Sequence, residues 1–165
     1  MSSNNFRDIV LYPNKFNASN WNTSLELWNK GNNVTTVNNN TVYKTIYSPS
    51  PAGYVEPKTA AYTGFTTTGA WTNNRALFNV SGTFVKGWNF FCLPNLSGST
   101  IFFPALGCFS SNNSLLDKFS TLGFYWTAGR TTTINAQDLD FSSDSVSPQG
   151  EYTSTFGLTM LSAFE

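Results

Sequence analysis

Short apolar runs, separated by asparagine, glycine, serine and proline, follow one another along the whole chain. The runs are rich in Val, Ile, Phe, Tyr, Trp and Thr, residue types that favour extended and half-buried backbone. They predict strands at residues 6–12, 75–79, 83–86, 88–93 and 101–103. Prolines at 13, 94 and 104 follow three of these runs and end them. The pattern therefore predicts a β-rich fold of the α+β class.

Helix signals are few. Pro57 is a favoured first-turn residue and precedes Ala60 and Ala61, before the chain reaches Gly64 and Gly69. We predict a helix that begins near Pro57 and a second short helical turn over residues 115–119. Residues 21–28 fit either a short helix or a turn, and residues 29–41 form a polar loop.

The last third of the chain alternates between apolar islands and loops of small polar residues. Loops carried by a rigid scaffold are the usual place for recognition, so this part predicts a binding surface. Within it, Asp138-Leu139-Asp140-Phe141 alternates like a strand, with Leu139 and Phe141 pointing inward. We expect both acids on the opposite face, as solvated surface residues.

A chain of 165 residues suits one domain, 1–165, with 1–20 as an entry strand and lead-in and 104–165 as display loops and closing strand. Hydrophobic residues make up 40% and charged residues only 11%, with a net charge of zero. This balance lacks the electric field that nucleic-acid binding or anionic membranes require. We therefore expect no nucleic-acid partner and no membrane insertion. The first five residues do not read as a signal peptide.

The chain contains no histidine. This removes the usual general base at neutral pH, the commonest metal ligand and every Ser-His or Cys-His nucleophile pair. The acids also lack the spacing of a calcium loop. We expect no catalytic residues, no metal site and no cofactor. Cys92 has the pattern of an inert buried strand residue, and its pairing with Cys108 stays open.

Three segments resemble the FISUMP-type domains of gut bacterial surface proteins. They are KTIYSPSPAGYVEP at residues 44–57, FPALG at 103–107 and LGFYWTA at 122–128. Together with AQDLDF at 136–141, they extend the resemblance over most of residues 20–165. It implies a C-type lectin fold with one or two short helices and twisted antiparallel sheets. In such a fold Tyr125 and Trp126 would plug the core beneath the display loops.

Some members of the family that the chain resembles are variable proteins of diversity-generating retroelements, in which C-terminal codons are rewritten at adenines. The implied function is a ligand-binding display domain with a hypervariable C-terminal surface. The residue types that fit rewritten codons at loop or outward strand positions define the candidate contact set. It consists of Cys108, Phe109, Ser110, Phe124, Arg130, Thr131, Thr132, Thr133, Ile134, Asp138, Asp140, Ser145 and Ser147.

The implied partner is a protein or glycan on a target cell surface. The implied location is a virion tail fibre or tip, where the chain would be a homotrimer, or a bacterial cell surface as part of a longer exported protein. Three alternatives stay open. The first is a non-diversified module of a lipoprotein or fimbrial adhesin, and the second is an oxidase of the formylglycine-generating type, which needs a reactive cysteine pair. The third, a calcium-dependent sugar lectin, is disfavoured because its ligand triplets are missing.

Overall fold

The computed structural model describes residues 28–30, 36–45, 48–93, 97–110, 115–132 and 135–164. The elements in these ranges, in chain order, are β1 (Tyr54–Val55), η1 (Thr63–Phe65), η2 (Arg75–Leu77), β2 (Val80–Ser81), β3 (Gly87–Leu93), β4 (Ser97–Pro104), β5 (Cys108–Phe109), β6 (Leu116–Asp117), β7 (Gly123–Arg130), β8 (Asn135–Phe141), β9 (Val146–Thr153) and β10 (Ala163–Phe164). Both η elements are single turns of 3-10 helix.

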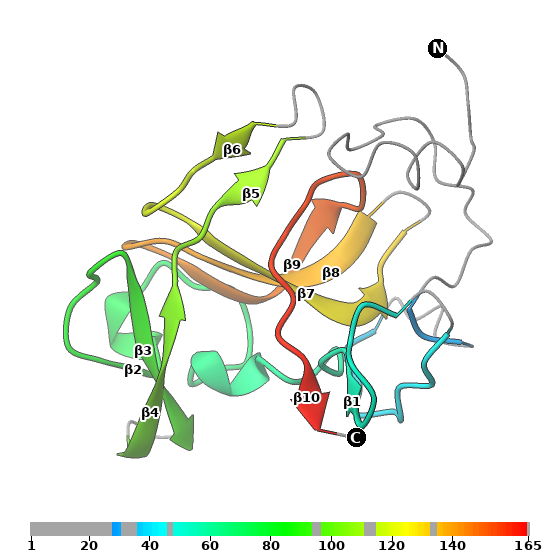
Figure 1. Ribbon diagram of the computed structural model, residues 1–165. Helices are drawn as coiled ribbons and strands as arrows, with labels where there is room; N and C mark the ends of the chain where they lie inside the picture. The colour runs from blue at the N-terminus through cyan, green and yellow to red at the C-terminus, as the bar shows by residue number, and fades with distance from the viewer. Residues whose placement is uncertain are drawn as a thin grey trace.

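Two antiparallel sheets of three strands organise the molecule, in the orders β2-β3-β4 and β7-β8-β9. Two smaller antiparallel pairs, β5-β6 and β1-β10, lie beside them (Figure 1). The predicted β-rich class is confirmed. The strands predicted at 88–93 and 101–103 are also confirmed, as parts of β3 and β4.

The main core lies between the two three-stranded sheets and is built mostly from aromatic rings. Phe90 of β3 is fully buried, stacks on Phe65 of η1 with ring centroids 4.0 Å apart, and meets Phe141 of β8 edge-on at 5.5 Å. Tyr125 of β7 closes the same cluster against Phe103 of β4 at 5.1 Å. Such offset and edge-on pairs add to the stabilisation from buried area alone.

Two hydrogen bonds tie the sheets together across this core. The Trp88 indole Nε1 donates to the Ser142 carbonyl at 2.8 Å, and the Tyr125 hydroxyl donates to the Pro104 carbonyl at 2.6 Å. The polar tips of Trp88 and Tyr125 thus each find a main-chain acceptor on, or directly after, a strand of the other sheet. Tyr125 and Trp126 are both buried, as predicted.

The helix predicted from Pro57 is wrong. Successive i to i+3 bonds, from Ala61 N to the Lys58 carbonyl at 2.9 Å and from Phe65 N to the Tyr62 carbonyl at 2.9 Å, form tight turns instead. The Thr59 hydroxyl also accepts a hydrogen bond from Asn38 N at 2.7 Å and donates one to the Asn38 carbonyl at 2.9 Å. These tertiary bonds override a weak local helix propensity.

Other predicted elements differ as well. Residues 115–119 hold strand β6 and a turn, in which Lys118 and Ser120 have left-handed φ angles of 61° and 65°. Residues 75–79 begin with η2 rather than a strand, and 83–86 are irregular after β2. The predicted strand 6–12 and residues 21–27 lie outside the described residues.

Both faces of the β7-β8-β9 sheet are covered. One face meets the aromatic core, and we call the other the outer face. It carries Phe124 and Trp126 of β7, opposite Asp140 and Asp138 of β8 respectively. Tyr152 of β9 lies on this face too, with its ring 4.9 Å from that of Phe124. The β5-β6 pair and the segment 154–160 cover the outer face (Figure 1).

Candidate functional site

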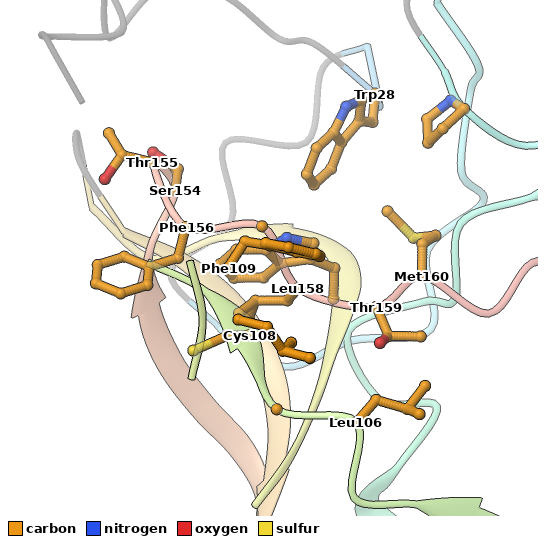
Figure 2. Close-up of a pocket in the computed structure, with 15 residues that line it drawn as sticks. Trp28, Leu106, Cys108, Phe109, Ser154, Thr155, Phe156, Leu158, Thr159 and Met160 are labelled. Atoms are coloured by element: carbon orange, nitrogen blue, oxygen red, sulfur yellow. The ribbon is translucent and has the colours of Figure 1, made fainter. Parts of the chain in front are cut away.

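A pocket of about 580 Å³ lies where β5, β7 and the segment 154–160 meet. This volume is within the range of roughly 300–1,000 Å³ that is usual for sites that bind small molecules. Its walls are mainly apolar and include Trp28, Phe109, Trp126, Phe156, Leu158 and Met160. Figure 2 shows Trp28 across the pocket from Phe109 and Leu158.

Main-chain bonds hold the segment 154–160 in place between two strands. Phe109 N donates to the Gly157 carbonyl at 2.8 Å, and Gly157 N donates back to the Phe109 carbonyl at 3.0 Å. Two residues later, Trp126 N donates to the Thr159 carbonyl at 2.9 Å, and Thr159 N donates to the Phe124 carbonyl at 3.2 Å. The segment therefore extends the β7 edge and carries β5 beside it, which fixes the pocket walls.

Aromatic contacts line the two ends of the pocket. Trp28 lies 6.3 Å from Trp126 between ring centroids, and Phe156 lies edge-on to Tyr152 at 4.8 Å. The Tyr152 hydroxyl is hydrogen-bonded to the Cys108 sulfur. Large rigid rings of this kind give contact area at a small entropic cost, as in antibody paratopes.

The β5-β6 pair beside the pocket exposes several large apolar side chains. Leu115, Leu116 and Phe119 are exposed, and Phe109 is 42% exposed. Clustered apolar residues on a surface commonly mark an interaction site.

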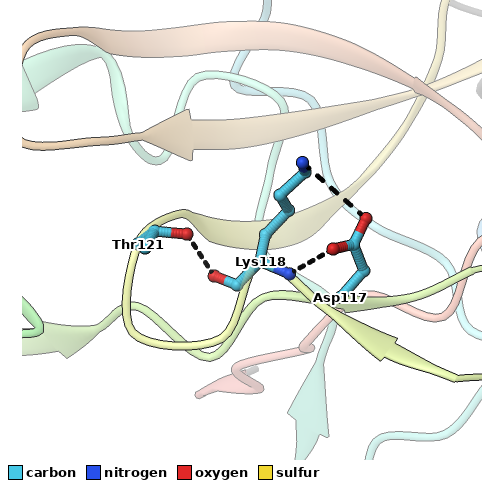
Figure 3. A network of polar contacts seen from close by, with 3 residues as sticks. All are labelled: Asp117, Lys118 and Thr121. Atoms are coloured by element: carbon cyan, nitrogen blue, oxygen red, sulfur yellow. Dashed lines mark hydrogen bonds and ion pairs between the residues drawn. The ribbon is translucent and has the colours of Figure 1, made fainter.

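A small polar network holds the turn after β6. Lys118 Nζ lies 3.9 Å from an Asp117 oxygen, Lys118 N donates to Asp117 Oδ1 at 2.8 Å, and the Thr121 hydroxyl donates to the Lys118 carbonyl at 2.8 Å (Figure 3). Gly107 faces this turn with a φ of 70°, and an added Cβ there would lie 2.7 Å from Phe119 N. The glycine is therefore required for the close approach of the two chain segments.

Four members of the predicted contact set are buried, which corrects their expected exposure. Cys108 and Phe124 are only 2% and 5% exposed, and Asp138 and Ser147 are also buried. Cys108 belongs to β5. Phe124, Asp138 and Ser147 belong to the three strands of the β7-β8-β9 sheet. Their side chains cannot form an open surface.

The other members are more accessible. Phe109 and Thr132 are exposed, while Ser110, Arg130, Thr131, Asp140 and Ser145 are partly exposed. Thr133 and Ile134 lie outside the described residues. Phe109 and Cys108 line the pocket, but the loop at 131–132 does not.

Several pocket residues were not predicted from the sequence. Trp28 and Leu106 carry no local signal for a binding role, and Leu158 and Met160 were not in the candidate contact set. The apolar island at 156–161 was the available signal. An apolar run that follows a polar loop and is too short for a central strand is compatible with a pocket wall as well as with a closing strand.

The cysteines do not form a reactive pair. Both are free, with Cys92 exposed and Cys108 buried, so the predicted burial of Cys92 is wrong. Burial and the nearby Asp117 raise the pKa of the Cys108 thiol, which keeps it protonated, whereas an activated thiol has a lowered pKa. Among the described residues, no cluster of three or more His, Cys, Asp or Glu side chains could hold a metal ion.

No family model, curated protein or solved structure matches this chain. Within the described ranges, no helix is long and apolar enough to cross a membrane.

Proposed function

We propose that this chain is a ligand-binding display domain with a C-type lectin fold, and that its ligand is anchored in the pocket between β5, β7 and the segment 154–160. The observation that carries the proposal is the apolar pocket of about 580 Å³, with Phe109 exposed at its edge. Two strands and a main-chain bridge fix its walls, so the pocket is formed before a ligand arrives.

The chemistry of the walls favours an uncharged ligand group. Among the described residues, the side chains that line the pocket include no Asp, Glu, Lys or Arg, and the polar ones are mainly Ser and Thr hydroxyls at 154, 155 and 159. An ionised group placed there would lose its hydration without gaining a partner of opposite charge. We propose that an aromatic or aliphatic group of a cell-surface protein or glycoconjugate enters the pocket, while the exposed leucines of β5-β6 contact the surrounding surface.

Only part of the candidate contact set then belongs to the hypervariable surface. Phe109, Ser110, Thr131 and Thr132 are accessible and fit positions that tolerate rewriting. Phe124 and Asp138 are buried, and a random change there would cost stability, so we assign them to the scaffold. A near-identical repeat of the last codons that differs only at adenines, beside a reverse transcriptase gene, would establish the diversification.

A fluorescence titration with the neutral apolar dye N-phenyl-1-naphthylamine tests the pocket. Phe109→Ala removes an aromatic wall and should weaken dye binding by about five- to tenfold. Phe102→Ala is the matched control, since Phe102 is exposed to a similar extent, 49%, but lies on β4 outside the pocket. Equal effects of the two substitutions, or no effect of Phe109→Ala, would contradict the assignment.

A further inference from the structure

Two carboxylates of β8 converge on the same point of the outer face. Asp138 is 0% exposed and lies opposite Gly150 of β9 in the strand register. A Cβ atom at Gly150 would lie 2.7 Å from Asp138 Oδ1 and closer still to Asp140 Oδ2. The missing side chain at position 150 therefore makes room for two acids whose oxygens face one small space.

The two acids have few polar partners. Neither Asp138 oxygen accepts a hydrogen bond from another residue of the described part. Asp140 accepts one from the Ser147 hydroxyl. Within the described ranges neither acid forms an ion pair. The ion pair found there joins Lys118 and Asp117, on the exposed turn after β6.

Among the described residues, the other titratable groups that act on this pair are acidic or neutral. On β9, Tyr152 lies on the same face as Asp138, and Glu151 acts on Asp138 from the other face. Tyr152 in turn interacts with Cys108 of β5 and Asp117 of β6, and the cation Lys118 acts on Cys108. Two ionised carboxylates at this distance would repel each other, and the buried Asp138 would also lack hydration. The protein avoids this cost if one of the two acids keeps its proton.

We propose that Asp138 and Asp140 share one proton at neutral pH and that this proton is a pH switch beneath the pocket. Asp138 lies directly opposite Trp126, which forms part of the pocket wall. The hydroxyl of Tyr152 connects the same region to Cys108, another wall residue. When the proton leaves for the solvent, a second negative charge appears behind these side chains. The proposal concerns the sheet itself and holds whatever the pocket binds.

The electrostatics of the pair agree with this geometry. Burial, and then the neighbouring Asp140, raise the pKa of Asp138 to about 8. Burial raises the pKa of Asp140 to about 6. Because the two carboxyl groups interact, the pair loses its two protons in two separate steps.

The sign of the pH effect follows from these shifts. In the unfolded chain both acids titrate near pH 4, so the folded protein holds more protons between about pH 4 and pH 8. Stability is therefore greatest below about pH 4, as far as this pair is concerned, and falls as pH rises toward 8. Most proteins whose carboxylates are paired show the opposite trend.

Urea unfolding at pH 5, 6, 7, 8 and 9 tests the proposal with three variants. For the wild type, we expect the unfolding equilibrium constant to rise by at least about five-hundredfold between pH 5 and pH 8, because a proton retained with a pKa of about 8 changes it by close to tenfold per pH unit until that pKa is reached. Asp138→Asn should remove most of this rise, and Asp140→Asn should reduce it. Asp144→Asn is the control, since Asp144 is exposed on the loop after β8 and should behave like the wild type.

The indole N–H signal of Trp126 in a heteronuclear NMR spectrum reports the switch without any ligand. It should shift with a midpoint near pH 8 in the wild type and lose this shift in Asp138→Asn. A wild-type pH profile that Asp138→Asn leaves unchanged would overturn the proposal, as would a Trp126 signal that does not move. Calcium that stabilises the wild type at pH 8 but not Asp138→Asn would also overturn it, since the pair would then hold a metal ion instead of a proton.

Discussion

Of two buried tyrosines in the core, Tyr125 has a hydrogen-bonded hydroxyl group and Tyr62, among the described residues, does not. The Tyr125 hydroxyl donates to the Pro104 carbonyl at 2.6 Å and links the two three-stranded sheets. Tyr62 packs edge-on against Phe103 at 5.9 Å, but its hydroxyl is buried and has no hydrogen-bond partner among the described residues. Burial raises the pKa of both phenols, with Tyr125 adding to the effect on Tyr62, so both are neutral at ordinary pH.

Replacing each tyrosine by phenylalanine should therefore have opposite effects on stability. Tyr125→Phe loses a hydrogen bond, which costs about 1 kcal/mol net, and the Pro104 carbonyl keeps its bond from Leu106 N at 3.1 Å. Tyr62→Phe removes a hydroxyl whose burial without a partner costs about 1–3 kcal/mol, so the variant should be as stable as the wild type or up to about 1 kcal/mol more stable.

Urea unfolding at pH 6, followed by tryptophan fluorescence, measures both free energies under the same conditions. We expect the two variants to differ by at least about 1 kcal/mol, with Tyr62→Phe the more stable. Unchanged m-values would show that the denatured state is not the cause. The reasoning is refuted if Tyr62→Phe loses as much stability as Tyr125→Phe, because the Tyr62 hydroxyl would then have a partner.

Two further predictions concern glycine positions and thiols. An added Cβ at Gly123 would lie 2.5 Å from a ring carbon of Phe141, which is buried in the core, so Gly123→Ala should cost about 1–3 kcal/mol in urea unfolding. Gly64→Ala meets nothing within 4 Å and should be neutral or slightly stabilising, and a similar loss in both variants would contradict the packing. In native protein an aromatic disulfide reagent should label Cys92 quickly and Cys108 only slowly, as their exposure requires. Two equally fast thiols would show that β5 does not cover Cys108.

The strands that build the core were predictable because both ends of each run carry a local signal. Residues 88–93 and 101–103 are mainly apolar runs that a proline follows, and Pro104 ends β4 at the predicted place, although β4 begins earlier than predicted, at Ser97. The errors fall where a contact with a distant residue decides the backbone. At η2 the Asn74 side chain caps Ala76 N at 3.1 Å, and the Arg75 guanidinium lies 3.8 Å from the centre of the Trp88 ring. The contact between Arg75 and Trp88 cannot be inferred from the local pattern, which was typical of a strand, whereas the Asn74 cap is a local signal that the strand prediction missed.

The candidate site was predicted only in part, because segments that are far apart in the sequence enclose its pocket. Phe109 was in the candidate contact set because its residue type fits a rewritten codon, and it lies at the pocket edge. Trp28 reaches the pocket from a segment nearly a hundred residues before its neighbour Trp126. No periodicity or composition connects two such segments, so the sequence could predict that a binding surface exists in the last third but not which residues enclose its pocket.

For the two acids of β8, the alternation of the sequence predicts the face of the sheet but not the exposure to solvent. The pattern correctly placed Asp138 and Asp140 on the face opposite Leu139 and Phe141, because successive strand residues alternate. It was wrong about the exposure of Asp138, since Phe156 and Cys108 of β5 contact Tyr152 on the same face and Asp138 is buried. A period of two residues says which side a side chain takes and nothing about what covers that side. An acid that is buried where the pattern predicts water is a conflict between local and global structure, and such conflicts are concentrated at functional sites. This conflict is the physical reason to look for a titration at Asp138.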